Sequence, residues 1–184
     1  MASAAPSASS DGVEELLATL AASRPGVRVA VIRPTTTLGP AAPLLFAGRA
    51  HISLSDFDPP MQFTWVDDVV AAFAAAIHSP AAAGTFNVGA PGTVRASEVA
   101  GILGVRGVRL PYRTRRRAAA LLDRLRIPSL HPGFVDMARY PIVVDSGRAR
   151  DELGWRPERD SAAALRRFGE TLRTDRRSRP PQRS

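Results

Sequence analysis

Three consecutive threonines, Thr35 to Thr37, follow an apolar stretch near the start of the chain and end at a Gly-Pro turn. The preceding residues 27–33 (VRVAVIR) are typical of a buried strand, and Pro34 ends its ladder because proline has no N–H to donate. In open α/β sheets, ligands bind beyond the carboxyl ends of the strands, where these hydroxyl groups would lie. The alternative is a strand-ending turn in which the hydroxyls bond to the local backbone. Pro34 to Thr37 are the first candidates for a ligand site.

Arginines form the second candidate site. Arg113, Arg115, Arg116 and Arg117 are clustered, and Arg139 follows them. A guanidinium can contact phosphate or carboxylate oxygens through two parallel hydrogen bonds, so these residues indicate an anionic ligand. A solvated basic face is the simpler alternative, and nucleic-acid binding is a weaker one because no aromatic residues alternate with the arginines.

Two other patterns are explained by local structure. Asp67-Asp68 precedes an apolar helical segment, so a helix cap and a favourable charge near the helix N-terminus account for it better than a metal or an acid/base pair. Gly101, Gly104 and Gly107 have the spacing GxxGxxG, but they follow a predicted helix and lead into a predicted strand. A pyrophosphate needs the reverse order, so Gly104 is predicted to be a helix C-cap.

Composition excludes several classes of protein. The 184 residues are 45% hydrophobic, which suits one domain, and they contain no cysteine for disulfides or thiol chemistry. His51, His78 and His131 are too far apart in sequence to suggest a metal site. The start of the chain lacks the features of a secretory signal, and the longest apolar run, 69–78, is about half of a membrane span. We expect a cytoplasmic protein without a metal and without a membrane anchor.

Charge is distributed unevenly along the chain. Residues 1–100 contain 5 arginines and 8 acids (−3), residues 101–184 contain 20 arginines and 9 acids (+11), and the two sum to +8. All 25 basic residues are arginine, and there is no lysine.

Hydrophobic periodicity predicts strands that alternate with helices, which indicates an α/β fold. The predicted strands are 27–33, 51–55, 63–66, 85–89 and 105–111. The predicted helices are 12–23, 114–125, 146–153 and 162–173, with a helix or turn at 44–48. A further helix follows Asp67-Asp68 and ends before Pro80, and another is capped by Ser97 and runs through Leu103. The apolar face of the first helix is Val13, Leu16, Leu17 and Leu20, and the inward face of the helix after Asp67-Asp68 is Val69, Ala72, Phe73 and Ala76. Residues 131–144 are predicted to be irregular or partly helical. We expect disorder in 1–10 and in the basic tail 174–184, with one folded unit between them.

Four segments occur in a familiar order and spacing: RPTTTLGP, FTWVDDVVAAF, GTFNVGAPGTVRASEVA and VVDSGRARDELGWRPERDSAAALRRF. Together, over residues 11–173, they resemble the C-terminal half of the extended short-chain dehydrogenase/reductases, the NAD-dependent epimerase/dehydratase family. The resemblance implies an incomplete Rossmann-like (doubly wound) sheet with a small C-terminal α/β substrate-binding region. It also implies NAD or NADP as cofactor and a nucleotide sugar or a related carbonyl or hydroxyl compound as substrate.

The resemblance assigns roles to individual residues. Pro34 and Thr35 would contact the cofactor. The substrate would be contacted by Thr36, Thr37, Leu44, Arg113 and Arg139.

The family's catalytic Tyr-x-x-x-Lys pair has no counterpart here. By spacing, the tyrosine and lysine should fall near Pro6 and Ser10, and Tyr112 and Tyr140 lie in other elements. We therefore assign no catalytic residue, because the tyrosine needs the lysine to act as a base. Met61-Gln62 also stands where the family often has an arginine before the VDD segment.

These observations lead to three hypotheses. The chain is the substrate-side portion of an NAD(P)-dependent enzyme and is inactive alone, because of a split gene, a misannotated start or a gene remnant. Alternatively, a separately encoded Rossmann half completes it. The third hypothesis is an arginine-rich interaction module for acidic partners or nucleic acid. Because the strand at 27–33 would lack its earlier neighbours, we expect the isolated chain to be aggregation-prone or partly molten.

Overall fold

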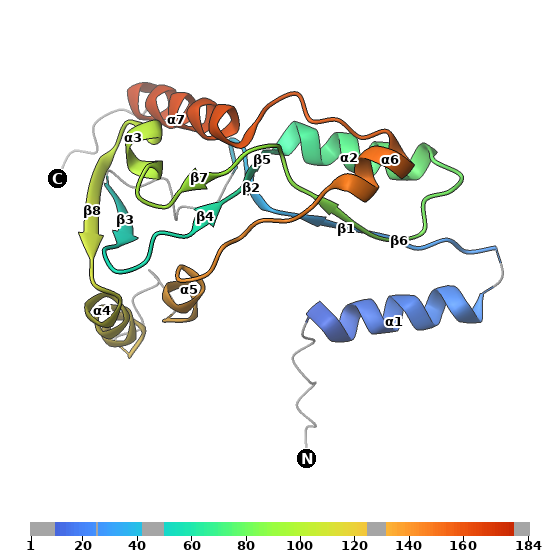
Figure 1. The fold of residues 1–184 in the computed structure, drawn as a ribbon, viewed down its shortest axis with the longest axis horizontal. Coiled ribbons are helices and arrows are strands. Elements are labelled where there is room, and N and C mark those ends of the chain that lie inside the picture. The colour runs from blue at the N-terminus through green and yellow to red at the C-terminus, as the bar shows by residue number, and fades with distance from the viewer. Residues whose placement is uncertain (1–9, 25, 42–49, 125–131, 179–184) are drawn as a thin grey trace, which may run out of the picture.

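The computed structural model describes residues 10–24, 26–41, 50–124 and 132–178. Strands and helices alternate along these ranges, which confirms the predicted α/β class. The described strands form four separate pairs, of which three are parallel, and helices supply several of the crossover connections. The architecture is an incomplete Rossmann-like one, with short pairs in place of one continuous sheet (Figure 1).

One extended segment contributes strands to two of these pairs. The pairs are β1 (Ala30–Pro34) with β6 (Gly84–Val88), and β2 (Thr36–Leu38) with β5 (Phe63–Trp65), both parallel. Thr35 lies where the chain changes partner, and its amide donates to the Val88 carbonyl at 3.0 Å. The expectation that Arg33-Pro34 stops the ladder is wrong, because Pro34 still pairs with Val88 and the Thr35 amide continues the bonding past it.

Two further pairs lie beyond β2 and β5. They are β3 (Ala50–Leu54) with β8 (Arg106–Leu110), which is parallel, and β4 (Pro60–Met61) with β7 (Val94–Arg95), which is antiparallel. A later segment joins β4, because the Gln62 amide donates to the Ile142 carbonyl and the Ile142 amide donates to the Pro60 carbonyl, at 3.0 and 3.3 Å.

The helices α2 (Val66–His78) and α6 (Gly147–Leu153) cover one face of β1 and β6 (Figure 1). Their core contains Val69, Ala72, Phe86, Val88 and Trp155. Arg148 fixes α6 to β6, since its guanidinium lies 4.5 Å from the Phe86 ring and donates to the carbonyls of Ala83 and Thr85. It also pairs with Glu152 one turn later, at the i,i+4 spacing that favours ion pairs on a helix surface.

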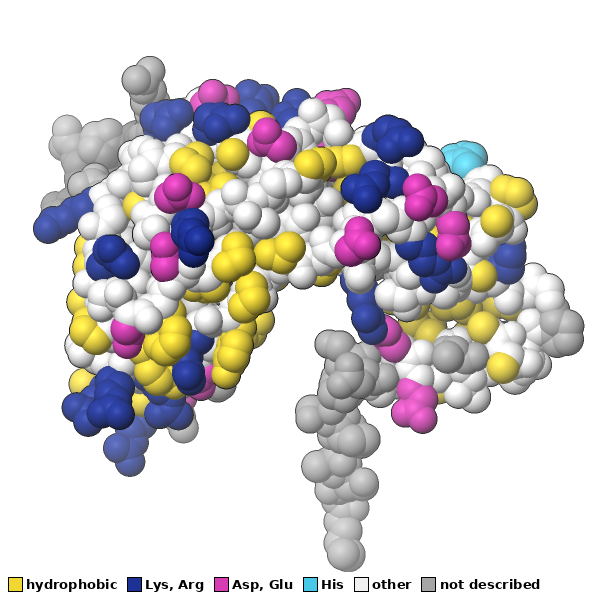
Figure 2. Space-filling view, viewed as in Figure 1, with side chains coloured by type: hydrophobic (Ala, Val, Ile, Leu, Met, Phe, Trp, Pro, Cys, Tyr) yellow, Lys and Arg dark blue, Asp and Glu magenta, His cyan; other side chains and the backbone are white. Residues whose placement is uncertain are grey.

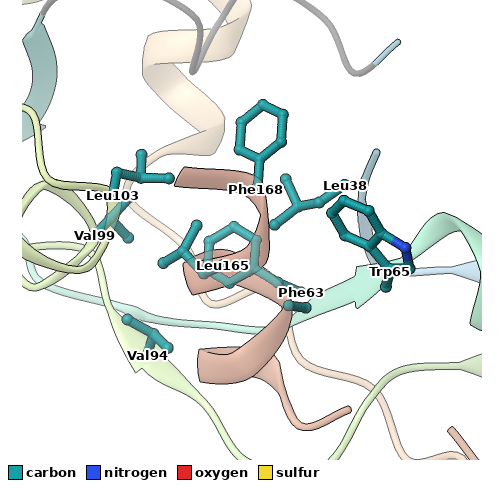
Figure 3. Close-up of a cluster of buried hydrophobic side chains, with 9 residues drawn as sticks. Leu38, Phe63, Trp65, Val94, Val99, Leu103, Leu165 and Phe168 are labelled. Carbon is teal, nitrogen blue, oxygen red and sulfur yellow. The ribbon is translucent and has the colours of Figure 1, made fainter. Parts of the chain in front are cut away.

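A larger core lies under α7 (Ser161–Ser178), which packs on α3 (Val99–Leu103), β2 and β5. Figure 3 shows Leu165 and Phe168 of α7 between Leu103 on one side and Leu38 and Phe63 on the other. All five side chains are almost completely buried, so this cluster holds the centre of the fold together.

The last two described helices before α6, α4 (Tyr112–Arg124) and α5 (Pro132–Met137), form a lobe with β3 and β8. We call this unit the arginine lobe. Its small core consists of Leu54, Ala119 and Val135. Figure 1 shows it at the end of the molecule opposite to α2 and α6.

Helix α1 (Ser10–Ser23) lies on the other side of β1 and β6 from α2 and α6 (Figure 1). Glu14 of α1 forms an ion pair with Arg33 of β1. The predicted apolar face of α1 is largely uncovered, since Val13, Leu16 and Leu20 are 44%, 68% and 36% exposed.

The predicted caps are wrong at two helices. Helix α2 begins at Val66, and its N-cap Trp65 has no side-chain cap bond, because Asp67 and Asp68 bind elsewhere. The Trp65 indole donates to Asp67, whereas Asp68 is buried and accepts the Glu158 amide at 2.8 Å. Helix α3 has Glu98 at its N-cap, because the Ser97 hydroxyl donates to Asp58 instead. The acidic first turn of α2 is as predicted.

Other predictions differ from the structure in detail. The expectation that Phe73 faces inward is wrong, because this side chain is 49% exposed. Helix α7 continues to Ser178, past the predicted end at 173, and no Gly or Pro interrupts this extension. Gly104 does end α3 in the left-handed conformation (φ 68°), which confirms it as a C-cap. Residues 1–9, the segment 44–48 with Leu44, and residues 179–184 lie outside the described residues.

Candidate functional site

The predicted threonine site lies where β1 passes into β2. Thr35 is 7% exposed, and its hydroxyl bonds to that of Thr64 at 2.8 Å. Thr64 also accepts the Ala90 amide at 3.1 Å, so the pair links the β1–β2 junction, β5 and the segment after β6. Pro34 is exposed, whereas Thr36 and Thr37 are half-buried. The Thr35 hydroxyl is thus already bonded within the protein, and its predicted cofactor contact stays a prediction.

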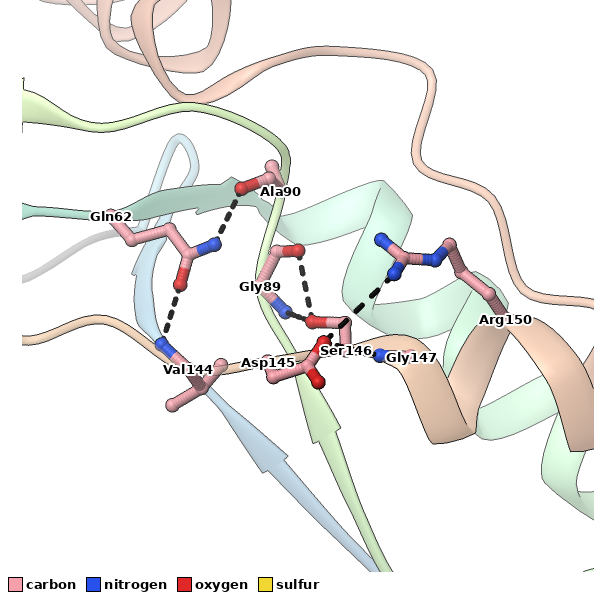
Figure 4. A network of polar contacts seen from close by, with 8 residues as sticks. All are labelled: Gln62, Gly89, Ala90, Val144, Asp145, Ser146, Gly147 and Arg150. Atoms are coloured by element: carbon pink, nitrogen blue, oxygen red, sulfur yellow. Dashed lines mark hydrogen bonds and ion pairs between the residues drawn. The ribbon is translucent and has the colours of Figure 1, made fainter.

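Beside this pair, Gln62 connects three segments that are far apart in sequence (Figure 4). Its amide nitrogen donates to the Ala90 carbonyl at 2.7 Å, and its amide oxygen accepts the Val144 amide at 2.9 Å. Gln62 is 5% exposed, so it satisfies backbone groups that have no access to water.

Ser146 closes the same network from the other side. Its oxygen accepts the Gly89 amide at 2.8 Å, and its hydroxyl donates to the Gly89 carbonyl at 3.1 Å. Gly89 has no room for a side chain, because a Cβ there would lie 2.5 Å from the Gln62 amide oxygen. We call this network the polar clasp; it consists of Gln62, Gly89, Ala90, Val144 and Ser146. It holds the segment with Val144 and Ser146 against the ends of β4 and β6 (Figure 4).

The predicted arginine site lies in the arginine lobe. The guanidinium carbon of Arg139 is 4.9 Å from the ring centroid of Phe57, 4.7 Å from that of Tyr112 and 5.7 Å from that of Tyr140. Phe57 and Tyr112 meet edge-to-face at 6.1 Å. These three rings form an aromatic cage around the Arg139 guanidinium, and the negative faces of the rings stabilise its charge.

Asp136 lies beside the cage. The Tyr112 hydroxyl donates to it at 2.6 Å, and Arg116 pairs with it at 3.3 Å. The Tyr112 hydrogen bond, together with the charges of Arg116 and Arg139, holds the pKa of Asp136 below its ordinary value. Asp136 is therefore a carboxylate at neutral pH.

The clustered arginines of α4 separate into different environments. Arg115 is half-buried near His51 of β3, and burial lowers its pKa. Burial, and after it the charge of Arg115, lowers the pKa of His51, so this histidine is neutral at pH 7. Arg113 and Arg117 are exposed. The predicted residues therefore form two groups, the threonines at the β1–β2 junction and the arginines in the lobe.

Figure 2 shows the molecule as an arch, with the arginine lobe on one side and α1 on the other. Apolar side chains line the inner side of the lobe, and basic ones gather at its lower end, where α4 lies. The end of α5 and the segment after it contribute to the exposed apolar surface, since Met137, Tyr140 and Val143 are 56%, 61% and 45% exposed.

Sequence reasoning missed the groups that organise both sites, namely Gln62, Thr64, Phe57 and Asp136. Their partners are remote in sequence, as the 82 residues between Gln62 and Val144 illustrate. An interval of this size has no signature in local periodicity. The one available signal was the pair of tyrosines, Tyr112 and Tyr140, which flank the arginines in question.

The described residues around β5 and Gly104 lack the strand–turn–helix arrangement of a pyrophosphate site. A pyrophosphate binds where a strand leads through a glycine-rich turn into a helix N-terminus. Within the described ranges β5 passes directly into α2, and Gly104 ends a helix instead of preceding one. In the same ranges, no group of three or more His, Cys, Asp or Glu could hold a metal, and no helix has the length and apolar character to cross a bilayer.

Comparisons with known proteins agree with this architecture. The sequence matches no known family model and no curated protein. Solved structures do match the fold. RMD from Pseudomonas aeruginosa, complexed with NADPH, has a TM-score of 0.61 and 18% identity over 89% of this chain and 53% of its own. UDP-glucose 4-epimerase from Thermotoga maritima, with UDP-glucose, has a TM-score of 0.60 and 20% identity over 89% and 53%.

A third match is UDP-glucuronic acid 4-epimerase from Bacillus cereus, in complex with UDP-glucuronic acid and NAD. Its TM-score is 0.59, with 15% identity over 87% of this chain and 50% of its own. The chain thus spans about half the length of the structures it matches. At these identities the likeness concerns the fold, and the chain has a partial Rossmann-like α/β fold similar to about half of each of these proteins.

Proposed function

We propose that the chain is the substrate-side portion of an NAD(P)-dependent epimerase, dehydratase or reductase that acts on a nucleotide sugar or a related carbonyl or hydroxyl compound. A complementary Rossmann half, joined to this chain or separate from it, would hold the cofactor and supply the Tyr-x-x-x-Lys pair. When that half is present, Pro34 and Thr35 of this chain would contact the cofactor. Thr36, Thr37, Leu44, Arg113 and Arg139 would face the substrate. We expect the reaction to take place in the cytoplasm.

The open edge of β1 is the observation that carries this proposal. Among the described strands β1 pairs only with β6, so its other edge has no neighbour. Beside it, between β1 and α2, opens a hollow of about 260 Å³ lined by Arg28, Ala30, Ile32, Phe73, Ala76, Ile77 and Ala82. A further parallel strand would pair with the free edge of β1, and apolar side chains beside that strand would fill the hollow.

Exposed apolar side chains concentrate around β1, on the helices at both sides of the β1–β6 pair. Of the 11 large hydrophobic side chains that are exposed in the described residues, seven belong to α1, α2 or the segment before β1: Val13, Leu16, Leu20, Val27, Val70, Phe73 and Ile77. Apolar surface of this extent marks an interaction site. Its position favours a partner that continues the sheet from β1.

The test is reconstitution with the reading frame upstream of this chain's coding sequence, expressed either as a fusion or together with it. NADH fluorescence is titrated with the chain alone and with the reconstituted protein. We expect saturable binding only after reconstitution, and loss of the interaction in Phe73→Asp, which places a charge in the hollow. Leu121→Asp, at an apolar position of α4 that is 58% exposed, is the control and should leave reconstitution unchanged. Tight NADH binding by the 184-residue chain alone would contradict the proposal.

The exposed arginines of α4 favour a second candidate function, an interaction module for acidic partners or nucleic acid. Arg113, Arg117 and Arg124 are exposed and, at spacings of four and seven residues, lie on one face of the helix. Figure 2 shows the basic side chains together at that end of the lobe. Among the described residues, none of the three has a carboxylate partner within 4 Å.

Binding of a single-stranded DNA of about 20 nucleotides at several salt concentrations separates the two functions. Phosphate contacts release counterions, so an interaction module would show a steep fall of affinity with salt. Replacing the three arginines by glutamine would then reduce this slope by about 0.7 for each phosphate that is no longer neutralised. The substrate-side proposal predicts weak binding with no dependence on these three residues.

A further inference from the structure

Arg139 has hydrogen-bond donors that the described protein does not use. Its guanidinium carbon lies over the rings of Phe57, Tyr112 and Tyr140, and its Nε is buried with no hydrogen-bond partner. No described acceptor bonds to the rest of this guanidinium either. The rings attract the ion through its charge, and its terminal N–H groups, which have no described acceptor, stay available for a planar acceptor.

The carboxylates nearest to the cage are already engaged. Asp136 accepts the Tyr112 hydroxyl and pairs with Arg116. Both oxygens of Asp56 accept the Tyr112 amide, at 2.9 and 3.1 Å. Asp136 is thus shared, because the charges of Arg116 and Arg139 both act on it, and Arg139 forms no ion pair of its own among the described residues.

Apolar surface lies next to this charge. Met137 and Tyr140 flank Arg139 in sequence, and Val143 follows, all three with roughly half or more of their surface exposed. We call these three residues the apolar strip. In Figure 2 apolar side chains line this inner side of the lobe. A ligand bound to Arg139 would therefore contact apolar groups. A diphosphate would instead need a second free cation at this position.

We propose that Arg139 binds the carboxylate of a small organic acid whose apolar body lies on the apolar strip. The inference rests on the proposed function, in which this lobe binds the substrate. Among the possible substrates it favours an apolar carboxylic acid over a nucleotide diphosphate. Two in-plane N–H groups of the guanidinium donate to the two carboxylate oxygens, and Tyr140 supplies both an edge of the cage and part of the strip.

The test is direct binding to the full chain, measured by isothermal titration calorimetry with 3-phenylpropionate as probe. The matched ligands are acetate, which lacks the apolar body, and 3-phenylpropan-1-ol, which lacks the charge. We expect a Kd of about 1 mM for 3-phenylpropionate and at least about tenfold weaker binding of both controls. UDP-glucose should bind no more tightly than inorganic phosphate.

Three variants locate the site. Arg139→Gln should weaken 3-phenylpropionate binding at least about tenfold, because it removes a charge-assisted pair of hydrogen bonds. Met137→Asp repels the carboxylate from an exposed position without touching the cage, so it should produce a similar loss even if Arg139→Gln disturbs the lobe. Arg166→Gln removes an exposed guanidinium of α7, outside the lobe, and should leave the binding of 3-phenylpropionate unchanged.

The inference is overturned if wild-type protein shows no saturable binding of 3-phenylpropionate, if Met137→Asp binds it as well as wild type does, or if UDP-glucose binds more tightly and loses affinity in Arg139→Gln or Arg115→Gln. None of these measurements needs NAD(H) or a complementary half. A failure of reconstitution therefore leaves this result standing, and a failure of carboxylate binding leaves the reconstitution result standing.

Discussion

Buried hydroxyl and amide groups explain why single residues matter so much at the centre of this molecule. The Thr64 hydroxyl serves both Thr35 and the Ala90 amide, and Gln62 serves both the Ala90 carbonyl and the Val144 amide. Leaving such a group without its partner costs about 1–3 kcal/mol. Threonines at the end of a strand therefore serve here first as structural links, whatever ligand the neighbouring Pro34 and Thr36 contact.

Gly89 gives the sharpest test of the polar clasp. Gly89→Ala places a Cβ 2.5 Å from the Gln62 amide oxygen, so we expect the free energy of unfolding to fall by about 1–3 kcal/mol, as overpacking does. Urea denaturation followed by circular dichroism measures it. Gly101→Ala is the matched control, because that glycine is exposed within α3 with open space around it, and it should stabilise the protein by up to about 1 kcal/mol. Equal effects of the two substitutions would rule the clasp out.

His51 predicts a pH dependence of stability. Its pKa is lowered in the folded protein by burial and then by Arg115, whereas in the unfolded chain it is near 6.5. As the pH falls below about 6.5 the unfolded state binds more protons than the folded state, so stability falls until the folded pKa is reached. His51→Gln should flatten the dependence of Tm on pH between about pH 7 and 5. A slope that is unchanged in His51→Gln would show that His51 has no part in it.

At the scale of elements, the sequence predicts the order of strands and helices well, because periodicity and turn residues are local. It predicts caps poorly. Asp68 looks like a cap for α2, but the Glu158 amide, 90 residues later, takes its carboxylate, and no local rule includes that competitor. Helical periodicity places Phe73 inside because it shows an apolar face without showing what covers it. The aromatic cage around Arg139 could not be predicted for the same reason, since Phe57 belongs to a loop that is distant in sequence.

The surface formed by β1 and α2 also predicts the behaviour of the isolated chain. Phe73→Ser combined with Ile77→Ser removes two exposed apolar groups beside an open strand edge, so we expect the double variant to aggregate less than wild type. Light scattering at matched concentrations during heating measures this. Leu121→Ser, at a comparably exposed position of α4, should not improve solubility, and an equal gain in both would assign the effect to general hydrophobicity instead of this surface.

For the whole molecule, the uneven burial predicts uneven stability. The cluster under α7 contains side chains that are fully buried, whereas no residue of β1 is. Amide hydrogen exchange should therefore show the strongest protection in β5 and α7 and weak protection in α1 and β1. Reconstitution with the complementary half should raise protection at residues 30–34. Strong protection of β1 in the isolated chain, with a sharp thermal transition, would contradict this description of an incomplete sheet.

The continuity of β1 and β2 through Thr35 has a mechanical consequence. Strand β1, which has the unpaired edge, and strand β2, which packs in the central cluster, belong to one stretch of backbone with a single residue between them. Any force on β1, such as a docking chain drawing it into register, passes along this tether to β2 and from there to Phe63 and α7, against which α3 packs. Capture of a second polypeptide at β1 should therefore act first on β2 and on the central cluster.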